Sequence, residues 1–267
     1  GLLSLPDWDV IDLPEVGPGA AAWRLAGVWP GQFVSRPAST CLELPVCDPE
    51  ALLAPLTPKH RQYLRRQARR VNELGIRVVT VPAEPEPLTR AVAELLDLHA
   101  RQWAGRPVNT LHLTAGFRDH LSAAVRHLAP AGRAAVTRYM IDGTVGAASL
   151  FLLTDQTVGG YLYGVAPALK ARLDIGSLMI RSGLDLGRET GATTLALLRG
   201  QEQSKLRWQP RARHSRRVVL LRPEAGRGHA TAASGLLWRA GRERLRTSPT
   251  ALRVAARLRH RTGTGSD

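Results

Sequence analysis

The fold is decided by one stretch of the chain, Leu197-Leu198-Arg199-Gly200-Gln201-Glu202-Gln203-Ser204-Lys205-Leu206-Arg207-Trp208. It follows a β-type run, Thr193 to Leu198, so it begins where a strand ends. If Gln201 to Arg207 forms a helical turn, Glu202 and Lys205 are three residues apart and share one face. The stretch therefore predicts a strand end that presents an acid and a base side by side.

The elements around this stretch follow a regular order. A helix is expected just before its strand, and Gly191 would end that helix. Three strands come earlier, and Asp142-Gly143 between the first two is typical of a type I′ hairpin turn. The predicted helices are 57–73, with Pro58 in its first turn, 87–103, 114–128 and 176–190. The predicted strands are 42–45, 76–81, 133–141, 145–153, 158–164, 193–198 and 218–221. The first of these strands is expected to be an edge strand that ends at Pro45.

The stretch resembles the Leu-Arg-Gly-x-Glu-x-x-Lys-x-x-Trp signature of the CelD/BcsL-type acyltransferases. These belong to the GNAT superfamily and are similar in fold to the Fem peptidoglycan aminoacyltransferases. Where that family usually has a Phe-Asp-Phe strand, this chain has Leu195-Ala196-Leu197. The resemblance implies a GNAT fold of the α+β or α/β class, a central mixed and mostly antiparallel sheet flanked by helices. The matching positions are Arg199, Gly200, Glu202, Lys205 and Trp208.

The same resemblance divides the chain into three parts. It covers roughly residues 57–222, where it implies the GNAT acyltransferase domain. Residues 1–40 are rich in Pro and Gly and are expected to form short strands and loops, and residues 1–56 look like the remnant of an N-terminal GNAT-like half. The rest of that half is expected to be missing from this chain. Residues 223–267 are predicted to be a basic helical extension.

Composition indicates a folded globular protein, since 44% of the 267 residues are hydrophobic. The sequence holds neither a signal-peptide pattern nor an apolar run of about 18 residues that could span a membrane. Cys41 and Cys47 are the only cysteines and have no His nearby, which disfavours both a disulfide framework and a metal site. We therefore expect a cytoplasmic protein that uses no metal.

The net charge of +15 is concentrated near the C-terminus. Residues 211–267 hold fourteen Arg and only three acids, a net +11. Residues 229–261 are predicted to form two basic helices, with a stripe made by Arg253, Arg257 and Arg261. Such a stripe favours a weak contact with an anionic membrane or RNA. The alternative is a solvated extension, because Trp238 is the only aromatic residue that accompanies the charge.

The loop and helix start at 170–178 are the predicted donor site. Amides at a helix start are unsatisfied and favour anions, so they can bind phosphate. Gly176 permits close approach, and Lys170 and Arg172 lie just upstream as charges for phosphate. The alternative is a helix start capped by Asp174, with no ligand. The residues predicted to bind the donor are Lys170, Arg172, Ile175, Gly176, Ser177 and Leu178.

Glu202 and Lys205 are the predicted catalytic residues. Acyl transfer needs a proton acceptor and a group that stabilises a developing oxyanion. Glu202 suits the first role, and a similar Lys in the Fem enzymes implies the second for Lys205. Arg199 is expected to position an anionic substrate or donor. The alternative is a structural ion pair that supports the loop, with Trp208 as its apolar lid.

Five further residues are predicted to contact substrate. His99 lies in a Leu-His-x-x-x-Trp pattern that resembles the family's, and Tyr161 and Tyr163 face one side of their strand. Arg65 belongs to an Arg-rich helix in which like charges stack on one face, and a bound anion would lower their repulsion. The alternatives are that His99 is a packed, buried residue, that the two tyrosines only pack against their neighbours, and that the Arg-rich helix presents a solvated basic face. The set is Arg65, His99, Tyr161, Tyr163 and Trp208.

These features lead to one predicted function and two rivals. The resemblance implies an N-acyltransferase that moves an acyl group, most simply acetyl from acetyl-CoA, to an amine or hydroxyl of a small-molecule or polysaccharide-precursor acceptor. The first rival is a non-catalytic truncated GNAT scaffold, favoured by Ala196 and the short N-terminal half. The second is an RNA- or tRNA-dependent Fem-like aminoacyltransferase, favoured by the Arg-rich helix and tail.

Overall fold

The computed structural model describes residues 1–6, 8–104, 110–223 and 235. The chain divides into two compact units, one of residues 40–213 and one of residues 1–39 with 214–267. The strands follow the order β1-β8-β2-β7-β6-β5-β4-β3. The predicted domain boundaries at residues 57 and 223 stay predictions.

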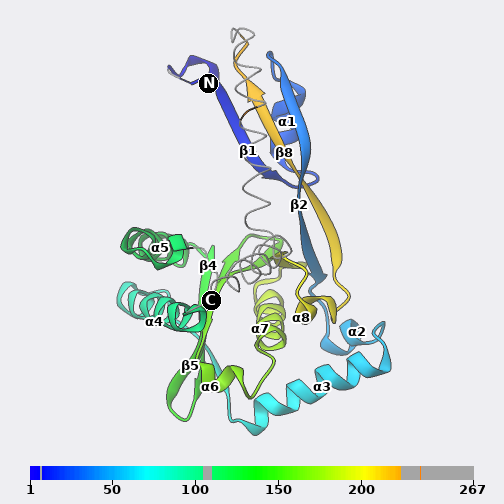
Figure 1. Ribbon diagram of the computed structural model, residues 1–267, viewed down its shortest axis with the longest axis vertical. Helices are drawn as coiled ribbons and strands as arrows, with labels where there is room; N and C mark the ends of the chain where they lie inside the picture. Colours follow the sequence, from blue (N-terminus) through cyan, green and yellow to red (C-terminus); the bar gives the residue numbers. More distant parts are fainter. Residues whose placement is uncertain (7, 105–109, 224–234, 236–267) are drawn as a thin grey trace, which may run out of the picture. The chain divides into compact units, whose positions relative to one another are not determined.

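The larger unit is built on an antiparallel meander (Figure 1). The meander consists of β4 (Ala134–Ile141), β5 (Thr144–Leu153) and β6 (Thr157–Val165), and β3 (Arg77–Thr80) pairs with the other edge of β4. The turn between β4 and β5 has positive φ at both central residues, 49° at Asp142 and 75° at Gly143, as a type I′ hairpin requires. The predicted three-stranded meander and its turn are therefore confirmed.

Helices cover both faces of this meander (Figure 1). On one face α4 (Pro85–Trp103) and α5 (Ala115–Leu128) pack against Ala148 and Leu150 of β5. On the other face α7 (Ile175–Thr190) packs in the cores that hold Ala147 and Phe151. Neighbouring residues of β5 alternate between the two cores because successive side chains of a strand point to opposite faces.

Four more helices surround the α7 face. The longest, α3 (Pro58–Glu73), is capped by the Thr57 hydroxyl, which accepts the His60 amide at 3.4 Å. Only Leu64 of α3 is buried, so the rest of the helix faces outward or lies at its margin. The others are short: α2 (Pro49–Leu53), α6 (Pro167–Lys170) and α8 (Gln203–Leu206). The predicted helices are confirmed to within two residues at each end, whereas α2 and α6 were not predicted.

The seventh strand, β7 (Thr194–Arg199), runs parallel to β6 and then separates from it. Pairing covers only Thr157 to Gly159 of β6, opposite Thr194 to Ala196. Beyond that point β7 pairs with β2 alone and bulges, because its partner register shifts between Ala196 and Leu198. Leu198 also has a φ of 56°, an uncommon conformation for a residue with a side chain. The two strands therefore splay apart at their carboxyl ends.

The smaller unit contains β1 (Val10–Val16), α1 (Ala21–Gly27), most of β2 (Phe33–Pro45) and most of β8 (Arg211–Leu221). Its core joins Val16 and Ala26 to Val218 and Leu220. The prediction of an edge strand at 42–45 is wrong, because β2 lies inside the sheet between β8 and β7. Pro45 is tolerated there as the last residue of the strand, where a missing N–H interrupts no ladder.

Part of the chain lies outside this description. The predicted basic helices at 229–261 fall almost wholly on residues that the structure does not describe. Within the described ranges, none of the helices combines the length and the apolar character that crossing a bilayer requires.

The buried Tyr139 makes unfolding depend on alkaline pH. Burial raises its pKa from 10.0 to about 12, while its hydrogen bond with Ser149 acts in the opposite direction. Above pH 10 the unfolded chain loses this proton and the folded chain keeps it, so stability present below pH 10 is lost as pH rises toward 12. We expect the loss to reach at most about 1.4 kcal/mol per pH unit. Urea titrations from about pH 9 to 11 should show this extra slope in the native chain and its absence in Tyr139→Phe.

Candidate functional site

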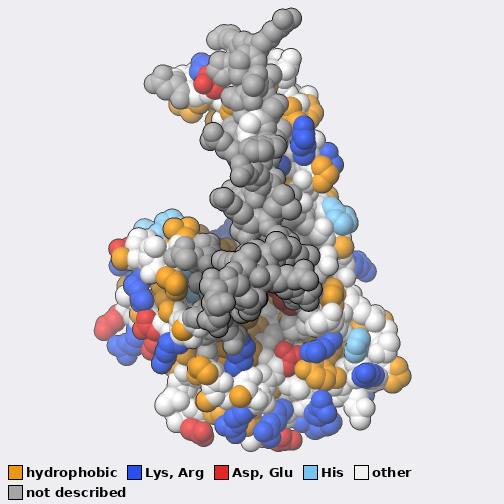
Figure 2. All heavy atoms as spheres, viewed as in Figure 1, with side chains coloured by type: hydrophobic (Ala, Val, Ile, Leu, Met, Phe, Trp, Pro, Cys, Tyr) orange, Lys and Arg blue, Asp and Glu red, His pale blue; other side chains and the backbone are white. Residues whose placement is uncertain are grey.

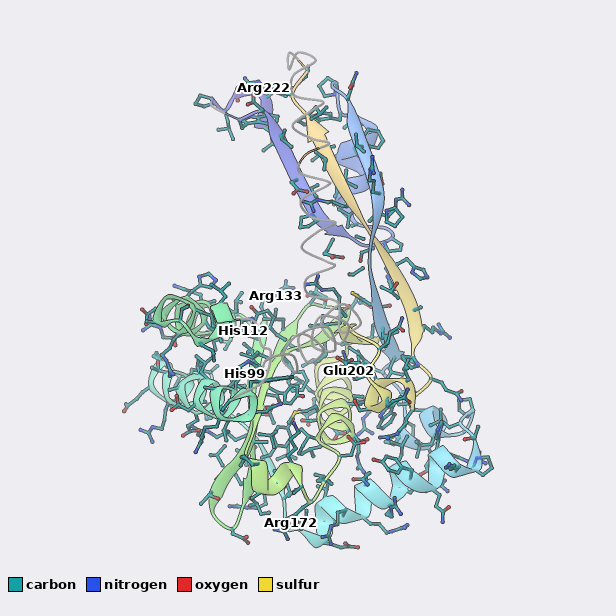
Figure 3. The ribbon with its side chains drawn as sticks, in the orientation of Figure 1. His99, His112, Arg133, Arg172, Glu202 and Arg222 are labelled. Atoms are coloured by element: carbon teal, nitrogen blue, oxygen red, sulfur yellow. The ribbon has the colours of Figure 1, made fainter. Side chains whose placement is uncertain are left out.

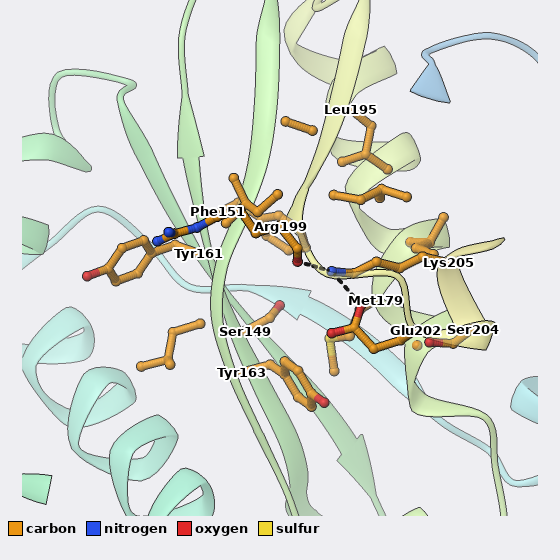
Figure 4. A pocket seen from close by; sticks show the side chains of 17 residues that line it. Ser149, Phe151, Tyr161, Tyr163, Met179, Leu195, Arg199, Glu202, Ser204 and Lys205 are labelled. Atoms are coloured by element: carbon orange, nitrogen blue, oxygen red, sulfur yellow. Dashed lines mark hydrogen bonds and ion pairs between the residues drawn. The ribbon is translucent and has the colours of Figure 1, made fainter. Parts of the chain in front are cut away.

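A pocket of about 290 Å³ opens where β6 and β7 separate (Figure 4). Its walls come from β5, β6 and β7, and α7 and the turn around α8 close it. The deep part is apolar, with Phe151 2% exposed and Leu195 1% exposed. Charged and hydroxyl side chains line it on two sides, with Glu202, Ser204 and Lys205 from the turn around α8 and Tyr161 and Tyr163 from β6, so the pocket suits a ligand with an apolar arm and a reactive polar end. The lining residues are Ser149, Phe151, Gly160, Tyr161, Leu162, Tyr163, Gly176, Met179, Ile180, Leu195, Ala196, Leu197, Leu198, Arg199, Glu202, Ser204 and Lys205.

Gly200 allows the chain to turn sharply from β7 into α8. Its φ of 106° lies in a region that residues with a side chain rarely adopt. A Cβ at this position would also lie 2.6 Å from Oε2 of Glu202, because that carboxylate folds back over the glycine. Gly200 therefore places the carboxylate close to the strand end, which explains the Gly two residues before the Glu.

Glu202 and Lys205 form an ion pair at the edge of this pocket (Figure 4). Lys205 Nζ lies 2.9 Å from Glu202 Oε2 and donates a 2.7 Å hydrogen bond to the backbone oxygen of Arg199. The Lys205 side chain is 21% exposed and the Glu202 side chain 60%. An ammonium has three N–H donors, so one remains for a ligand oxygen. The predicted shared face is confirmed, and the pair both lines the pocket and braces the turn.

The start of α7 is occupied by the carboxylate of Asp174. Its Oδ2 accepts the Ser177 hydroxyl at 2.9 Å, and its Oδ1 accepts the Ser177 amide at 3.4 Å. Ile175, Ser177 and Leu178 are buried, and Gly176 alone of the four lines the pocket, against Ser204. Asp174 therefore supplies a negative charge that a helix start favours, and donor contacts by these four residues stay a prediction.

Lys170 and Arg172 lie on the segment that joins β6 to α7. Lys170 ends α6, and both side chains belong to exposed residues. Among the described residues, neither of them lines the pocket, and Figure 3 draws Arg172 apart from Glu202. Their predicted contact with donor phosphate therefore depends on a donor that extends beyond the pocket.

Tyr161, Tyr163 and Arg199 all line the pocket, as does Ala196. The two tyrosines are 41% and 39% exposed, so their rings are available to a ligand. In Figure 4 the Arg199 side chain extends toward Tyr161 and away from Lys205. The sequence prediction that both tyrosines face one side of their strand is confirmed, and these three residues join the candidate catalytic pair.

His99 lies on α4, on the face of the sheet away from α7. Its Nδ1 lies 2.8 Å from the backbone oxygen of Tyr163, and the neighbouring Gln102 accepts the Val165 amide at 3.1 Å. These groups belong to the stretch of β6 that β7 has left, so α4 satisfies part of the open strand edge. His99 is 6% exposed and is not among the pocket residues described above. Its contact to the site is through the backbone of Tyr163.

Trp208 and Arg65 lie elsewhere in the larger unit. Trp208 is 5% exposed and packs in the core with Leu53 and Leu64. Trp208 and Arg65 both line a second pocket of about 250 Å³. Arg65 pairs with Glu50 on the outer side of α3. In Figure 2, Lys and Arg side chains are frequent along the lower edge of the view, where α3 runs in Figure 1. The structure thus brings neither residue to the candidate catalytic pair.

Sequence reasoning missed a polar cluster that joins α3, α7 and α8. Arg207 Nη1 donates 3.1 Å hydrogen bonds to Asp174 Oδ2 and to the hydroxyl of Tyr63. Tyr63 in turn donates to Asp174 Oδ2 at 2.9 Å. Tyr63 and Arg207 are more than a hundred residues apart, and no periodicity or spacing relates them. The one available signal was Arg207 itself, a charge beside the buried Trp208.

Solved structures of low sequence identity share this architecture. The C-terminal domain of a protein described as a lysylphosphatidylglycerol synthetase, from Agrobacterium fabrum, is 14% identical with a TM-score of 0.56, covering 85% of this chain and 70% of that one. L-PGS from Bacillus licheniformis is 12% identical with a TM-score of 0.55, covering 83% and 70%. FemX is 11% identical with a TM-score of 0.56, covering 80% and 72%. At such identities the likeness establishes the fold alone.

The sequence comparison assigns the family. No protein with a curated description is significantly similar to this chain. Residues 58–206, more than half of the chain, match the model of the acetyltransferase (GNAT) domain. The eight-stranded mixed sheet with helices on both faces is the predicted GNAT fold, and the protein belongs to the acetyltransferase (GNAT) domain family.

Proposed function

We propose that this protein is an N-acyltransferase of the CelD/BcsL type that moves an acyl group, most simply acetyl, from acyl-CoA to an amine or hydroxyl. The observation that carries the proposal is the pocket between β6 and β7, which has apolar walls and the Glu202–Lys205 pair at its polar end. Its depth and apolar lining fit the narrow arm of a thioester donor. Near Gly160 the wall is open, because a Cβ there would meet nothing closer than 3.8 Å.

The two charged side chains take complementary roles in this proposal. Glu202 accepts the proton of the attacking amine or hydroxyl, because it is the exposed carboxylate at the pocket mouth. Lys205 donates its remaining N–H to the thioester carbonyl oxygen, where negative charge develops as the new bond forms. The carbon–sulfur bond then breaks, the electron pair leaves with the sulfur, and the proton held on Glu202 neutralises the thiolate. Atoms and charge balance without a metal.

The remaining pocket residues are assigned to orientation. Arg199 offers a guanidinium to an anionic part of the acceptor or donor, and Tyr161 and Tyr163 offer exposed rings and hydroxyls. A ring pair of this kind suits the apolar C–H faces of a sugar-containing acceptor, and the tyrosine hydroxyls suit its polar edge, which agrees with the proposed polysaccharide precursor. Ala196 lines the same wall, so the pocket has a methyl group where the resemblance has an Asp.

Calorimetric titration with a panel of acyl-CoAs and with bulk tRNA tests the proposal. We expect micromolar binding of at least one acyl-CoA, and release of free thiol when an amine acceptor is added. Binding of tRNA with no binding of any acyl-CoA would instead favour the Fem-like aminoacyltransferase. If no acyl-CoA and no tRNA binds to the folded protein, the non-catalytic scaffold is the better description.

The predicted phosphate contacts are tested by the double variant Lys170→Ala with Arg172→Ala. We expect CoA affinity to fall, with roughly 1–3 kcal/mol lost per charged hydrogen bond. Because both residues are exposed and lie outside the pocket, stability should not change. Titration with CoA measures the loss, and titration with the shorter pantetheine thioester is the control. An unchanged CoA affinity would show that the donor phosphates bind elsewhere.

A further inference from the structure

The short helix α8, which carries Lys205 and directly follows Glu202, needs contacts with other elements to stay in place. α8 has four residues, Gln203–Leu206, and has no side-chain cap at its start. A single helical turn is unstable in water, because nucleation costs more than one turn of hydrogen bonds returns. Its position must therefore come from contacts with the rest of the larger unit.

Arg207 supplies the main polar contact. Its Nη1 bonds to Asp174 Oδ2 and to the Tyr63 hydroxyl, each at 3.1 Å, and its guanidinium lies 4.5 Å above the Tyr63 ring. The side chains of Arg207 and Asp174 are only 32% and 14% exposed. Hydrogen bonds between charged groups strengthen as water is excluded, so this contact is worth more than a surface ion pair.

Asp174 connects the same contact to two other helices. Its carboxylate caps α7 through Ser177 and accepts the Tyr63 hydroxyl from α3. Its amide donates to Gln67 Oε1 of α3 at 3.1 Å. Burial and the hydrogen bond to Asp174 raise the pKa of Tyr63, so this hydroxyl stays protonated at neutral pH. One carboxylate therefore joins α3, α7 and α8, which lie near one another in Figure 1.

Close packing leaves α8 little freedom along α7. A Cβ added at Gly176 would lie 2.7 Å from the Ser204 hydroxyl, so the first turn of α7 touches α8 directly. Trp208, the residue after Arg207, is buried in the core. The polar cluster and Trp208 fix α8 from its C-terminal side, the Gly176 contact holds it at Ser204, and Lys205 bonds to the Arg199 oxygen.

We propose that Arg207, Asp174 and Tyr63 are positioning residues, which hold α8 so that Glu202 and Lys205 stay at the pocket between β6 and β7. None of the three lines that pocket, so they act through α8 rather than on substrate. The proposal rests on the acyltransferase function for its effect on turnover. Its effect on the mobility of α8 does not depend on that function.

Three variants test the cluster with little change in volume. Arg207→Gln removes the charge, Tyr63→Phe removes the hydroxyl and keeps the ring, and Asp174→Asn keeps an oxygen that can cap α7. Arg188→Gln is the matched control, since Arg188 forms an exposed pair with Asp185 near the far end of α7. Arg207→Lys, which keeps the charge, tests for rescue.

Hydrogen exchange of the Lys205 and Leu206 amides is the first measurement, because both bond to the Glu202 oxygen, at 2.9 and 3.1 Å. We expect Arg207→Gln to speed their exchange by about ten- to a hundredfold, the range for one lost charged hydrogen bond. Tyr63→Phe should have a smaller effect, and Arg188→Gln none. Unchanged exchange in Arg207→Gln would overturn the proposal, whatever the activity of the protein.

Kinetics with the acyl-CoA that binds is the second measurement. We expect kcat to fall about tenfold in Arg207→Gln, with donor affinity within twofold of native and partial recovery in Arg207→Lys. Faster exchange with unchanged kcat would show that the cluster holds α8 without serving catalysis. If Lys205→Ala also keeps full activity, the assigned catalytic pair is wrong, and the exchange result alone decides the anchoring. Should Asp174→Asn weaken the cap of α7 enough to unfold the protein, Arg207→Gln and Tyr63→Phe still decide, since neither replaces the residue that caps α7.

Discussion

Replacing Lys205 by alanine is expected to lower turnover by about 10²–10³-fold, as loss of one oxyanion donor does in other enzymes. The Lys205 ammonium lies at the pocket edge and has one N–H group left for the thioester oxygen. Its loss therefore acts on the transition state more than on the bound acyl-CoA. Donor affinity by calorimetry should therefore stay within a few-fold of native. Release of thiol from the acyl-CoA, with and without acceptor, measures the turnover.

The native ion pair complicates this variant, because Lys205 also braces the turn through Glu202 and the Arg199 oxygen. Lys205→Arg keeps a positive charge and serves as the conservative comparison, while Glu202→Gln removes the base but keeps the volume. Melting temperatures of the three variants separate loss of the brace from loss of chemistry. Full activity in Lys205→Ala, with native stability, would remove Lys205 and the proposed oxyanion role from the mechanism.

Replacing Gly164 by alanine is expected to destabilise the fold by about 3 kcal/mol, at the upper end for overpacking a core. An added Cβ would meet the backbone N of His99, the Leu95 oxygen at 2.6 Å and the Leu98 Cβ at 2.7 Å. Two of these atoms are backbone, so α4 as a whole must move away from β6. That movement would also strain the His99 and Gln102 hydrogen bonds to β6.

Gly159→Ala is the matched control on the same strand. A Cβ at Gly159 would meet only ordinary contacts, the Leu152 oxygen at 3.8 Å and the Ala196 Cβ at 4.0 Å. We expect its free energy of unfolding to lie within about 1 kcal/mol of native, because alanine also restricts the unfolded chain. Urea denaturation of both variants measures the difference. Equal stability of the two would mean that α4 does not pack against β6 as closely as described.

The local elements could be read from the sequence because their signals are local. Thr57 and Pro58, Asp142-Gly143 and Gly191 each set the backbone of their own turn, and the structure has a cap or a positive φ at these places. Apolar periodicity then placed α3, α4, α5 and α7 to within two residues. These signals gave the order of strands and helices, and the resemblance of the signature stretch implied the GNAT fold, which the structure and the family match confirm.

The signature stretch also predicted which side chains meet within it. A spacing of three residues puts Glu202 and Lys205 on one face of any helical turn, and their ion pair follows. Tyr161 and Tyr163 share a face because strand side chains alternate, and both line the pocket. These are consequences of backbone geometry over a few residues, which no distant part of the chain can reverse.

Other features required the tertiary structure because they depend on segments far apart in the sequence. β2 reads as an edge strand from its own residues, yet β8 pairs on its open side. His99 and Trp208 are both buried, one against the Tyr163 backbone and the other in the core, and neither lines the pocket with Glu202 and Lys205. The sequence offered Asp174 as a helix cap only in the alternative to a donor site, and only the fold brings Tyr63 and Arg207 to it, because a hydrogen bond between distant residues leaves no periodic trace in the sequence.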